Sequence, residues 1–158
     1  MDKNFKDIRI MDNFYQTSMF FPMPLTLIGT LAEDGKTTSY GAYSLVFPYY
    51  IAGKDYYAFI LEARNSSNTA QNILRSKKCA LNFIPDDPKY FKEAVRMGWP
   101  GDTTDEKMKD FSLTLVDGKR AKDNPSELFP KVIDEAFQVI ECTWDRSLDG
   151  AEEDQPGV

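Results

Sequence analysis

The sequence contains no histidine, only two cysteines and no long run of apolar residues. The missing histidine excludes Ser-His-Asp and Cys-His catalysis, and it removes the side chain that most often binds a metal ion. A zinc site is not expected, because the remaining thiols, Cys79 and Cys142, are not spaced like a metal-binding motif. No apolar segment reaches the roughly 18 residues that a membrane-spanning helix needs, so the sequence predicts no membrane span.

Other absences restrict the binding partners and the cellular compartment that we expect. The sequence has neither a G-x-G-x-x-G run nor a P-loop. The net charge of −6 argues against nucleic acid as a partner, because phosphate backbones are bound by stripes of Lys and Arg. The first ten residues mix charges and lack the apolar stretch of a signal peptide. We therefore expect a cytoplasmic protein in which both cysteines are buried free thiols.

The residues that are present indicate one globular domain. With 158 residues, of which 42% are apolar and 13% aromatic, the chain is long enough for one hydrophobic core. We expect a single domain over residues 1–158, with its core in residues 22–144 and an acidic tail over residues 145–158. Without a histidine base, redox or group-transfer chemistry is expected to come from a cofactor.

The order of strand-like and helix-like segments predicts a mainly β fold, a small barrel with short helices. The Asp34-Gly35 turn between two apolar runs is typical of a β-hairpin, and Pro48 is expected to end the second run. Asn68 is the expected N-cap of the first helix, with Gln71 completing a capping box. We expect strands over residues 24–32, 37–46, 56–62, 79–84 and 137–144, and helices over residues 69–76 and 89–97.

The segment from Arg64 to Asn72 combines hydroxyl, amide and guanidinium groups at the start of a predicted helix. The first N–H groups of a helix and its partial positive charge attract phosphate, and an Arg side chain can add a bidentate contact. Between Ala63 and Pro85 there are four basic residues and no acidic one, although the chain is acidic overall. The same pattern fits an N-cap beside a solvated basic surface, so phosphate binding and a structural role both stay open here.

Four segments of the chain follow the motif order of a known family. The run Ser66-Ser67-Asn68-Thr69-Ala70-Gln71-Asn72-Ile73 precedes a strand that ends in Leu81-Asn82-Phe83. Residues 24–35 contain an expected strand and turn, residues 38–44 read Thr-Ser-Tyr-Gly-Ala-Tyr-Ser, and residues 139–142 read Val-Ile-Glu-Cys. Together these segments, spread over residues 22–144, resemble the flavin reductase-like family. Its members typically have a Lys-Asp-Thr-x-x-Asn-Ile motif and an Asn-x-Ala-Pro-Tyr-Ser segment.

This resemblance implies a six-stranded FMN-binding split barrel that forms a homodimer, with FMN near the subunit interface. Thr69 and Asn72 match the Thr and Asn of the motif, and Thr69 is the expected phosphate contact. Ser67 and Asn68 stand where the family often has Lys and Asp, so Arg64 is expected to supply the missing positive charge.

The resemblance also implies residues at the flavin ring. Tyr43 and Ser44 match the strand segment that lies against the isoalloxazine, although Ala42 replaces the usual proline. Asn82 matches a family position, and a hydrogen bond at the end of a strand explains it equally well. The implied cofactor-binding residues are Tyr43, Ser44, Arg64, Ser66, Ser67, Asn68, Thr69, Asn72 and Asn82, with no catalytic side chain and no metal ligand.

Three further features allow a functional or a structural interpretation. Several aromatic residues fit stacking on a flavin or nicotinamide, but they fit a barrel core or dimer interface better: Phe47, Tyr49, Tyr50, Tyr56 and Tyr57. Trp99, in a Gly-Trp-Pro-Gly turn, fits a cover over a pocket or a packed loop anchor. Glu141 lacks a second carboxylate partner and is not expected to be a catalytic acid.

The family continues with closing strands, whereas residues 152–158 are acidic and rich in turn formers. The expected barrel is therefore truncated or closes differently. For function, the resemblance implies an oxidoreductase in which NAD(P)H passes hydride directly to bound FMN, a step that needs no protein base. A second hypothesis is an FMN-binding electron carrier or flavin-holding module without nicotinamide turnover. A third is a barrel without flavin that acts as a scaffold.

Overall fold

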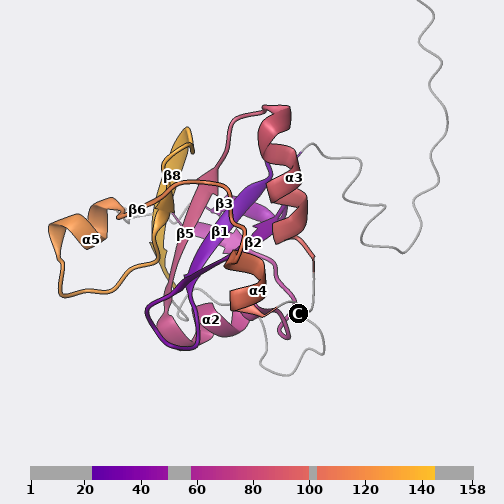
Figure 1. The fold of residues 1–158 in the computed structure, drawn as a ribbon. Coiled ribbons are helices and arrows are strands. Elements are labelled where there is room, and N and C mark those ends of the chain that lie inside the picture. The colour runs from indigo at the N-terminus through magenta and orange to yellow at the C-terminus, as the bar shows by residue number, and fades with distance from the viewer. Residues whose placement is uncertain (1–22, 50–57, 100–102, 145–158) are drawn as a thin grey trace, which may run out of the picture.

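The computed structural model describes residues 23–49, 58–99 and 103–144, which form antiparallel sheets and short helices (Figure 1). The largest sheet has the strand order β2-β1-β5-β8 and consists of β1 (Thr26–Leu31), β2 (Thr38–Tyr43), β5 (Lys78–Phe83) and β8 (Gln138–Thr143). Two smaller ribbons pair β3 (Val46–Tyr49) with β4 (Ala58–Leu61), and β6 (Leu115–Val116) with β7 (Val132–Ile133). The helices are α2 (Asn68–Ser76), α3 (Pro88–Met97), α4 (Thr104–Met108) and α5 (Lys119–Asp123). All strand pairs among the described residues are antiparallel, and their combination with short helices agrees with the expected α+β class.

Strand β1 is the centre of the fold, and all six of its residues are buried. Its side chains alternate between the two faces of the sheet. Leu27 belongs to a core cluster with Ala94 and Met97 of α3. Ile28 belongs to a second cluster, which includes Ile73 of α2 and residues of the β3–β4 ribbon. The sheet is therefore covered on both faces, and α2 lies near its lower end in Figure 1.

The predicted hairpin between β1 and β2 is confirmed. Its strands pair antiparallel, and Gly35 has a φ of 69°, a conformation that glycine adopts without strain. The Asp34 carboxylate accepts hydrogen bonds from the Thr37 hydroxyl and from the backbone N–H groups of Lys36 and Thr37. These bonds, first that of the Thr37 hydroxyl, lower the pKa of Asp34 because they stabilise its charged form.

The prediction that Pro48 ends a strand is wrong. β2 stops at Tyr43, and Pro48 lies inside β3, opposite Phe59 of β4. Within the described residues β3 has a partner on one side only, so the missing N–H of Pro48 disrupts no second ladder. Strand β7 and helix α5 were not expected, since each is too short for its periodicity to appear in the sequence.

The Asn82 side chain joins three strands in the interior. It is fully buried, and its amide group donates to the Leu27 and Ala80 carbonyl oxygens, each at 3.0 Å. Its side-chain oxygen accepts from the Ile133 backbone N–H at 2.9 Å. The amide thus connects β5 to β1 and to β7, and it satisfies polar groups that water cannot reach.

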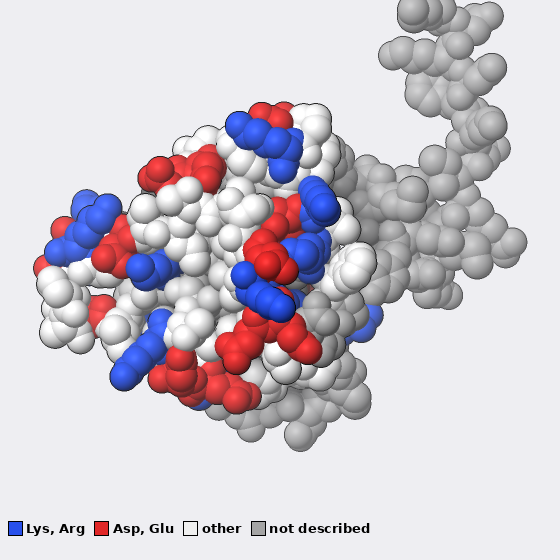
Figure 2. Space-filling view, viewed as in Figure 1, with Lys and Arg blue, Asp and Glu red and all other residues white. Residues whose placement is uncertain are grey.

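Charged side chains of both signs are mixed over the face drawn in Figure 2. Among the residues that the structure describes, no helix is long and apolar enough to cross a membrane. Over the same residues, no group of three or more His, Cys, Asp or Glu side chains is arranged to hold a metal ion.

We expect Asn82→Ala to lower the free energy of unfolding by about 3 kcal/mol, because the substitution leaves a buried N–H and two carbonyl groups without their partner. Urea denaturation followed by fluorescence measures the change as a lower midpoint at an unchanged slope. Gln138→Ala, at an exposed position on β8, is the control and should change the value by less than about 0.5 kcal/mol. Equal effects of the two substitutions would contradict this role of Asn82.

Candidate functional site

A cavity of about 730 Å³ opens where β2 ends and α2 begins. This volume lies in the range of about 300–1,000 Å³ that is typical of sites for small molecules and cofactors. Seven of the nine predicted cofactor-binding residues line it: Tyr43, Ser44, Arg64, Ser66, Ser67, Asn68 and Thr69. The structure therefore brings together one segment from β2 and its following loop with a second from the start of α2.

The first turn of α2 differs by one residue from the prediction. The N-cap is Ser67, whose side-chain oxygen accepts from the Ala70 backbone N–H at 3.1 Å, and Asn68 is the first helical residue. The predicted capping box does not form either, because the Gln71 side chain donates to the Asn65 carbonyl oxygen at 2.6 Å. The hydroxyl of Ser67 also accepts from the Tyr43 hydroxyl at 3.2 Å, which joins the helix start to the end of β2.

Thr69 lies where α2 approaches β2 most closely. A Cβ atom at Gly41 would lie 2.5 Å from the Thr69 hydroxyl oxygen and 2.8 Å from the Tyr43 ring, so only glycine allows this approach. Thr69 is 6% exposed, and its hydroxyl has no hydrogen-bond partner among the described residues. A nearly buried hydroxyl at a cavity wall is thus left to bind a ligand.

Two cations line the cavity, and sequence reasoning identified only one of them. Arg64 is exposed beside the start of α2, as expected. The second is Lys107 of α4, which is 9% exposed and donates to the Met97 carbonyl oxygen at 3.4 Å. Arg96 holds α4 against α3 by donating to the Lys107 carbonyl oxygen at 2.6 Å. No local pattern could reveal Lys107, because only the packing of α3 and α4 brings it to the cavity.

Aromatic and apolar side chains complete the cavity wall. Tyr40 is 1% exposed, stacks on Phe111 and donates to the Lys131 carbonyl oxygen at 2.6 Å. Burial raises the pKa of Tyr40, so this residue stays neutral and serves as wall rather than as an acid or base. Trp99 also lines the cavity and is 61% exposed, which agrees with its interpretation as a cover over a pocket.

The two other predicted cofactor-binding residues, Asn72 and Asn82, do not line the cavity. The Asn72 amide donates to the Thr30 hydroxyl at 3.0 Å, and its oxygen accepts from Arg75 at 2.6 Å. Asn82 makes the bonds between strands described above. Both side chains are buried and hydrogen-bonded within the protein. Of the predicted aromatic cluster, Tyr50, Tyr56 and Tyr57 lie outside the described residues.

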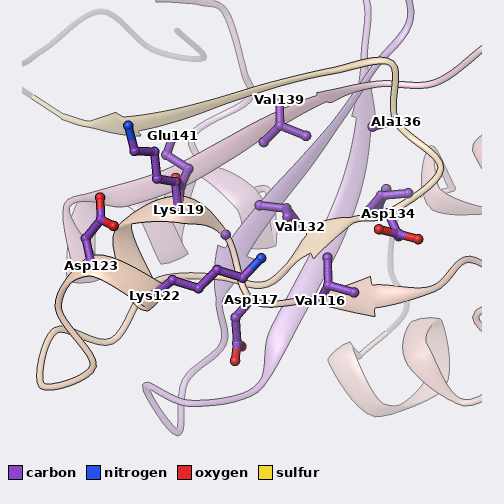
Figure 3. Close-up of a pocket in the computed structure, with 12 residues that line it drawn as sticks. Val116, Asp117, Lys119, Lys122, Asp123, Val132, Asp134, Ala136, Val139 and Glu141 are labelled. Carbon is purple, nitrogen blue, oxygen red and sulfur yellow. The ribbon is translucent and has the colours of Figure 1, made fainter.

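A second, more open hollow of about 450 Å³ lies between β8, α5 and the β6–β7 ribbon. Figure 3 shows valines from three strands, Val116, Val132 and Val139, beside the charged residues of α5. Glu141, also in this hollow, accepts from the Arg120 backbone N–H at 3.0 Å and so closes the start of α5. The Glu141 carboxylate thus satisfies a backbone N–H group in the first turn of α5.

No protein-family model and no curated protein matches this chain. Solved structures do. Flavoredoxin from Methanosarcina acetivorans is 20% identical, with a TM-score of 0.61 over 87% of this chain and 63% of that protein. The 2-nitrobenzoate 2-nitroreductase of Pseudomonas fluorescens is 17% identical, with a TM-score of 0.63 over 87% and 64%. The NADH:FAD oxidoreductase of Streptomyces globisporus is 12% identical, with a TM-score of 0.61 over 89% and 77%.

The chain has the flavin reductase-like fold. The resemblance that the sequence motifs indicated is thereby confirmed for the fold. The chain spans less than two thirds of the length of the flavoredoxin and of the nitroreductase. Its cavity, built from the motif residues of β2 and α2, is the candidate site for function.

Proposed function

We propose that this chain binds FMN in the cavity between β2 and α2 and passes hydride from NAD(P)H to the flavin. The observation that supports this most strongly is the composition of the cavity. The cavity wall combines a helix N-terminus, the Thr69 hydroxyl and two cations with the strand end at Tyr43 and Ser44 and the side chain of Trp99. An anionic phosphate and a flat aromatic ring need these two kinds of surface.

The phosphate of FMN is proposed to lie at the start of α2. The first N–H groups of this nine-residue helix lie at the cavity wall, and the helix dipole favours an anion there. Thr69 donates its unpartnered hydroxyl, and Arg64 and Lys107 supply positive charge. The charged residues that line the cavity are Glu62, Arg64 and Lys107, so positive charges outnumber negative ones there. This local charge favours an anion although the whole chain is negative.

The isoalloxazine ring is proposed to lie against Tyr43 and Ser44, with Trp99 limiting access of water. The hydrogen bond from Tyr43 to Ser67 fixes the tyrosine ring relative to the phosphate end, so both ends of the site are held in one geometry. Bound flavin supplies the hydride chemistry. The residues of this chain bind it, orient it and shield it, which agrees with the absence of histidine.

We expect Thr69→Val to weaken FMN binding about tenfold, because one hydrogen bond to a charged group is lost while the shape of the side chain is kept. Titrations followed by flavin fluorescence should be run with FMN and with riboflavin, which lacks the phosphate. Riboflavin affinity should change less than about twofold, since no contact to the ring is removed.

Thr114→Val, at an exposed position outside the cavity, is the matched control and should bind both flavins like the wild type. An equal loss of affinity for FMN and for riboflavin would mean that Thr69 contacts the flavin ring and not the phosphate. No binding of FMN by the folded wild type would reject the flavin site altogether.

A flavin-holding electron carrier without nicotinamide turnover is the second candidate, supported by the structural similarity to flavoredoxin. The similarity to an NADH:FAD oxidoreductase favours turnover. With FMN present, we expect the wild type to oxidise NADH or NADPH in steady state, measured by the loss of nicotinamide absorbance. Thr69→Val should raise the FMN concentration needed for half-maximal rate. If the chain binds FMN but oxidises neither NADH nor NADPH, the reductase hypothesis is rejected and the electron-carrier hypothesis is retained.

We further propose that the strands β1 to β5 and β8 form the six-stranded split barrel, in one domain that pairs as a homodimer. The β3–β4 ribbon packs its inner residues Val46, Phe59 and Leu61 on the same core cluster as the large sheet. Its outer face exposes Phe47, Tyr49 and Ile60, which lie side by side in the ribbon register. An apolar patch of this kind favours contact with a second subunit.

We expect Phe47→Glu to convert the dimer to a monomer in analytical ultracentrifugation, because the carboxylate would be buried without a partner charge. Phe91→Glu, on the exposed side of α3, is the control, since Phe91 is similarly exposed but lies away from the ribbon. A wild-type chain that sediments as a monomer at all concentrations would reject the dimer. A dimer that persists in Phe47→Glu would place the interface elsewhere.

A further inference from the structure

The two cysteines of the chain lie directly opposite each other on neighbouring strands. Cys79 of β5 pairs with Cys142 of β8 in the antiparallel register. Directly paired residues point to the same face of a sheet, and both side chains belong to the core cluster on that face, which also contains Leu81 and Ile140. The two thiols are free in this structure.

The spacing of such a pair suits a disulfide. Opposite residues in antiparallel strands have Cα atoms about 4.5–5.5 Å apart, within the range of about 4.4–6.8 Å found between disulfide-linked residues. A disulfide therefore needs rotation of the two side chains and no rearrangement of the backbone. β8 is the outermost strand of its sheet among the described residues, so it can adjust its position more freely than β1 or β5.

The two thiols differ in exposure and in acidity. Cys142 is half-buried, and its pKa is lowered, first by a hydrogen bond with Cys79 and then by attraction to Arg120. Cys79 is buried, and its pKa is raised by the same hydrogen bond and by burial. Since the thiolate is the attacking species, Cys142 is suited to react first and Cys79 to react second.

We propose that Cys79 and Cys142 form a redox-active dithiol that closes to a cross-strand disulfide when it meets a small disulfide such as glutathione disulfide. The Cys142 thiolate attacks one sulfur of the small disulfide, forms a mixed disulfide and releases one small thiol. Cys79 then attacks the Cys142 sulfur, the protein disulfide forms and the second small thiol leaves. Two protein thiols are oxidised, one small disulfide is reduced to two thiols, and the two protons pass to the leaving thiolates.

This pair is separate from the flavin cavity, because neither cysteine lines it. In a reducing cytoplasm a disulfide that opens and closes is the form expected of a redox-sensing or catalytic pair, whereas a permanent structural disulfide is rare there. The bond would fix β8, the outer strand, to β5. It would also join two distant parts of the chain, which restricts the unfolded state.

The test uses the full chain without flavin, reduced, desalted and then incubated with excess glutathione disulfide. Because the chain has only two cysteines, thiol titration and intact mass report on this pair alone. We expect titratable thiols to fall to none, with a mass decrease of about 2 Da from the loss of two hydrogens. The protein should stay monomeric in denaturing gels without reductant, and its melting temperature should rise by several degrees until dithiothreitol reverses the change.

Variants assign the order of the two steps. Cys79→Ser should accumulate one stable glutathionyl group on Cys142, because the resolving thiol is missing, and Cys79→Ala serves if the serine variant does not fold. Cys142→Ser should react with glutathione disulfide much more slowly than the wild type and than Cys79→Ser. A wild type that keeps both thiols, that stops at a stable mixed disulfide or that forms disulfide-linked dimers would overturn the proposal.

Discussion

The hydrogen bond between the Asn72 amide and the Thr30 hydroxyl fixes helix α2 on the central strand β1, and the candidate site depends on that placement. Both residues are buried, at 3% and 1% exposure, so neither polar group can turn to water instead. Arg75 strengthens the junction by donating to the Asn72 side-chain oxygen and to the Leu31 carbonyl oxygen. Breaking it would leave buried groups unpaired, at a cost of about 1–3 kcal/mol each. The helix therefore packs on the sheet in one stable position, with its N-terminus at the end of β2.

Three further constraints, which act where α2 begins and β2 ends, shape the cavity. Gly41 lets β2 pass within contact distance of Thr69, and the Tyr43 hydroxyl ties the strand to the Ser67 cap. Helix α4, held through Arg96, adds Lys107 from the opposite side. Local backbone chemistry thus places the helix N-terminus at the cavity, whereas tertiary packing provides the second cation.

The sequence predicted the larger elements and two of the segments that line the cavity, because these depend on local patterns. The hairpin at Gly35, helix α2 and the cavity segments around Tyr43 and Thr69 all follow from turn chemistry, capping and motif order. The features that the sequence did not predict depend on long-range contacts. Asn72 matches a cofactor-binding position by motif, and in the structure its amide donates to the hydroxyl of Thr30. Lys107 has no local signal, and the pairing of the two cysteines depends on a strand register that the sequence alone does not fix.

The two proposed chemistries lie toward opposite edges of one sheet, the flavin at β2 and the dithiol at β5 and β8, with β1 between them. Helix α2 is the element in contact with both regions, since its N-terminus lines the cavity and Ile73 belongs to the same core cluster as Cys79. The helix is hydrogen-bonded to β1 through Asn72, whereas β8 is paired on one side only. A bond between the cysteines needs only a rotation of their side chains, and any small residual adjustment falls on the outer strand, which is less constrained than the helix. By this argument the sheet isolates the flavin site from the redox state of the cysteines.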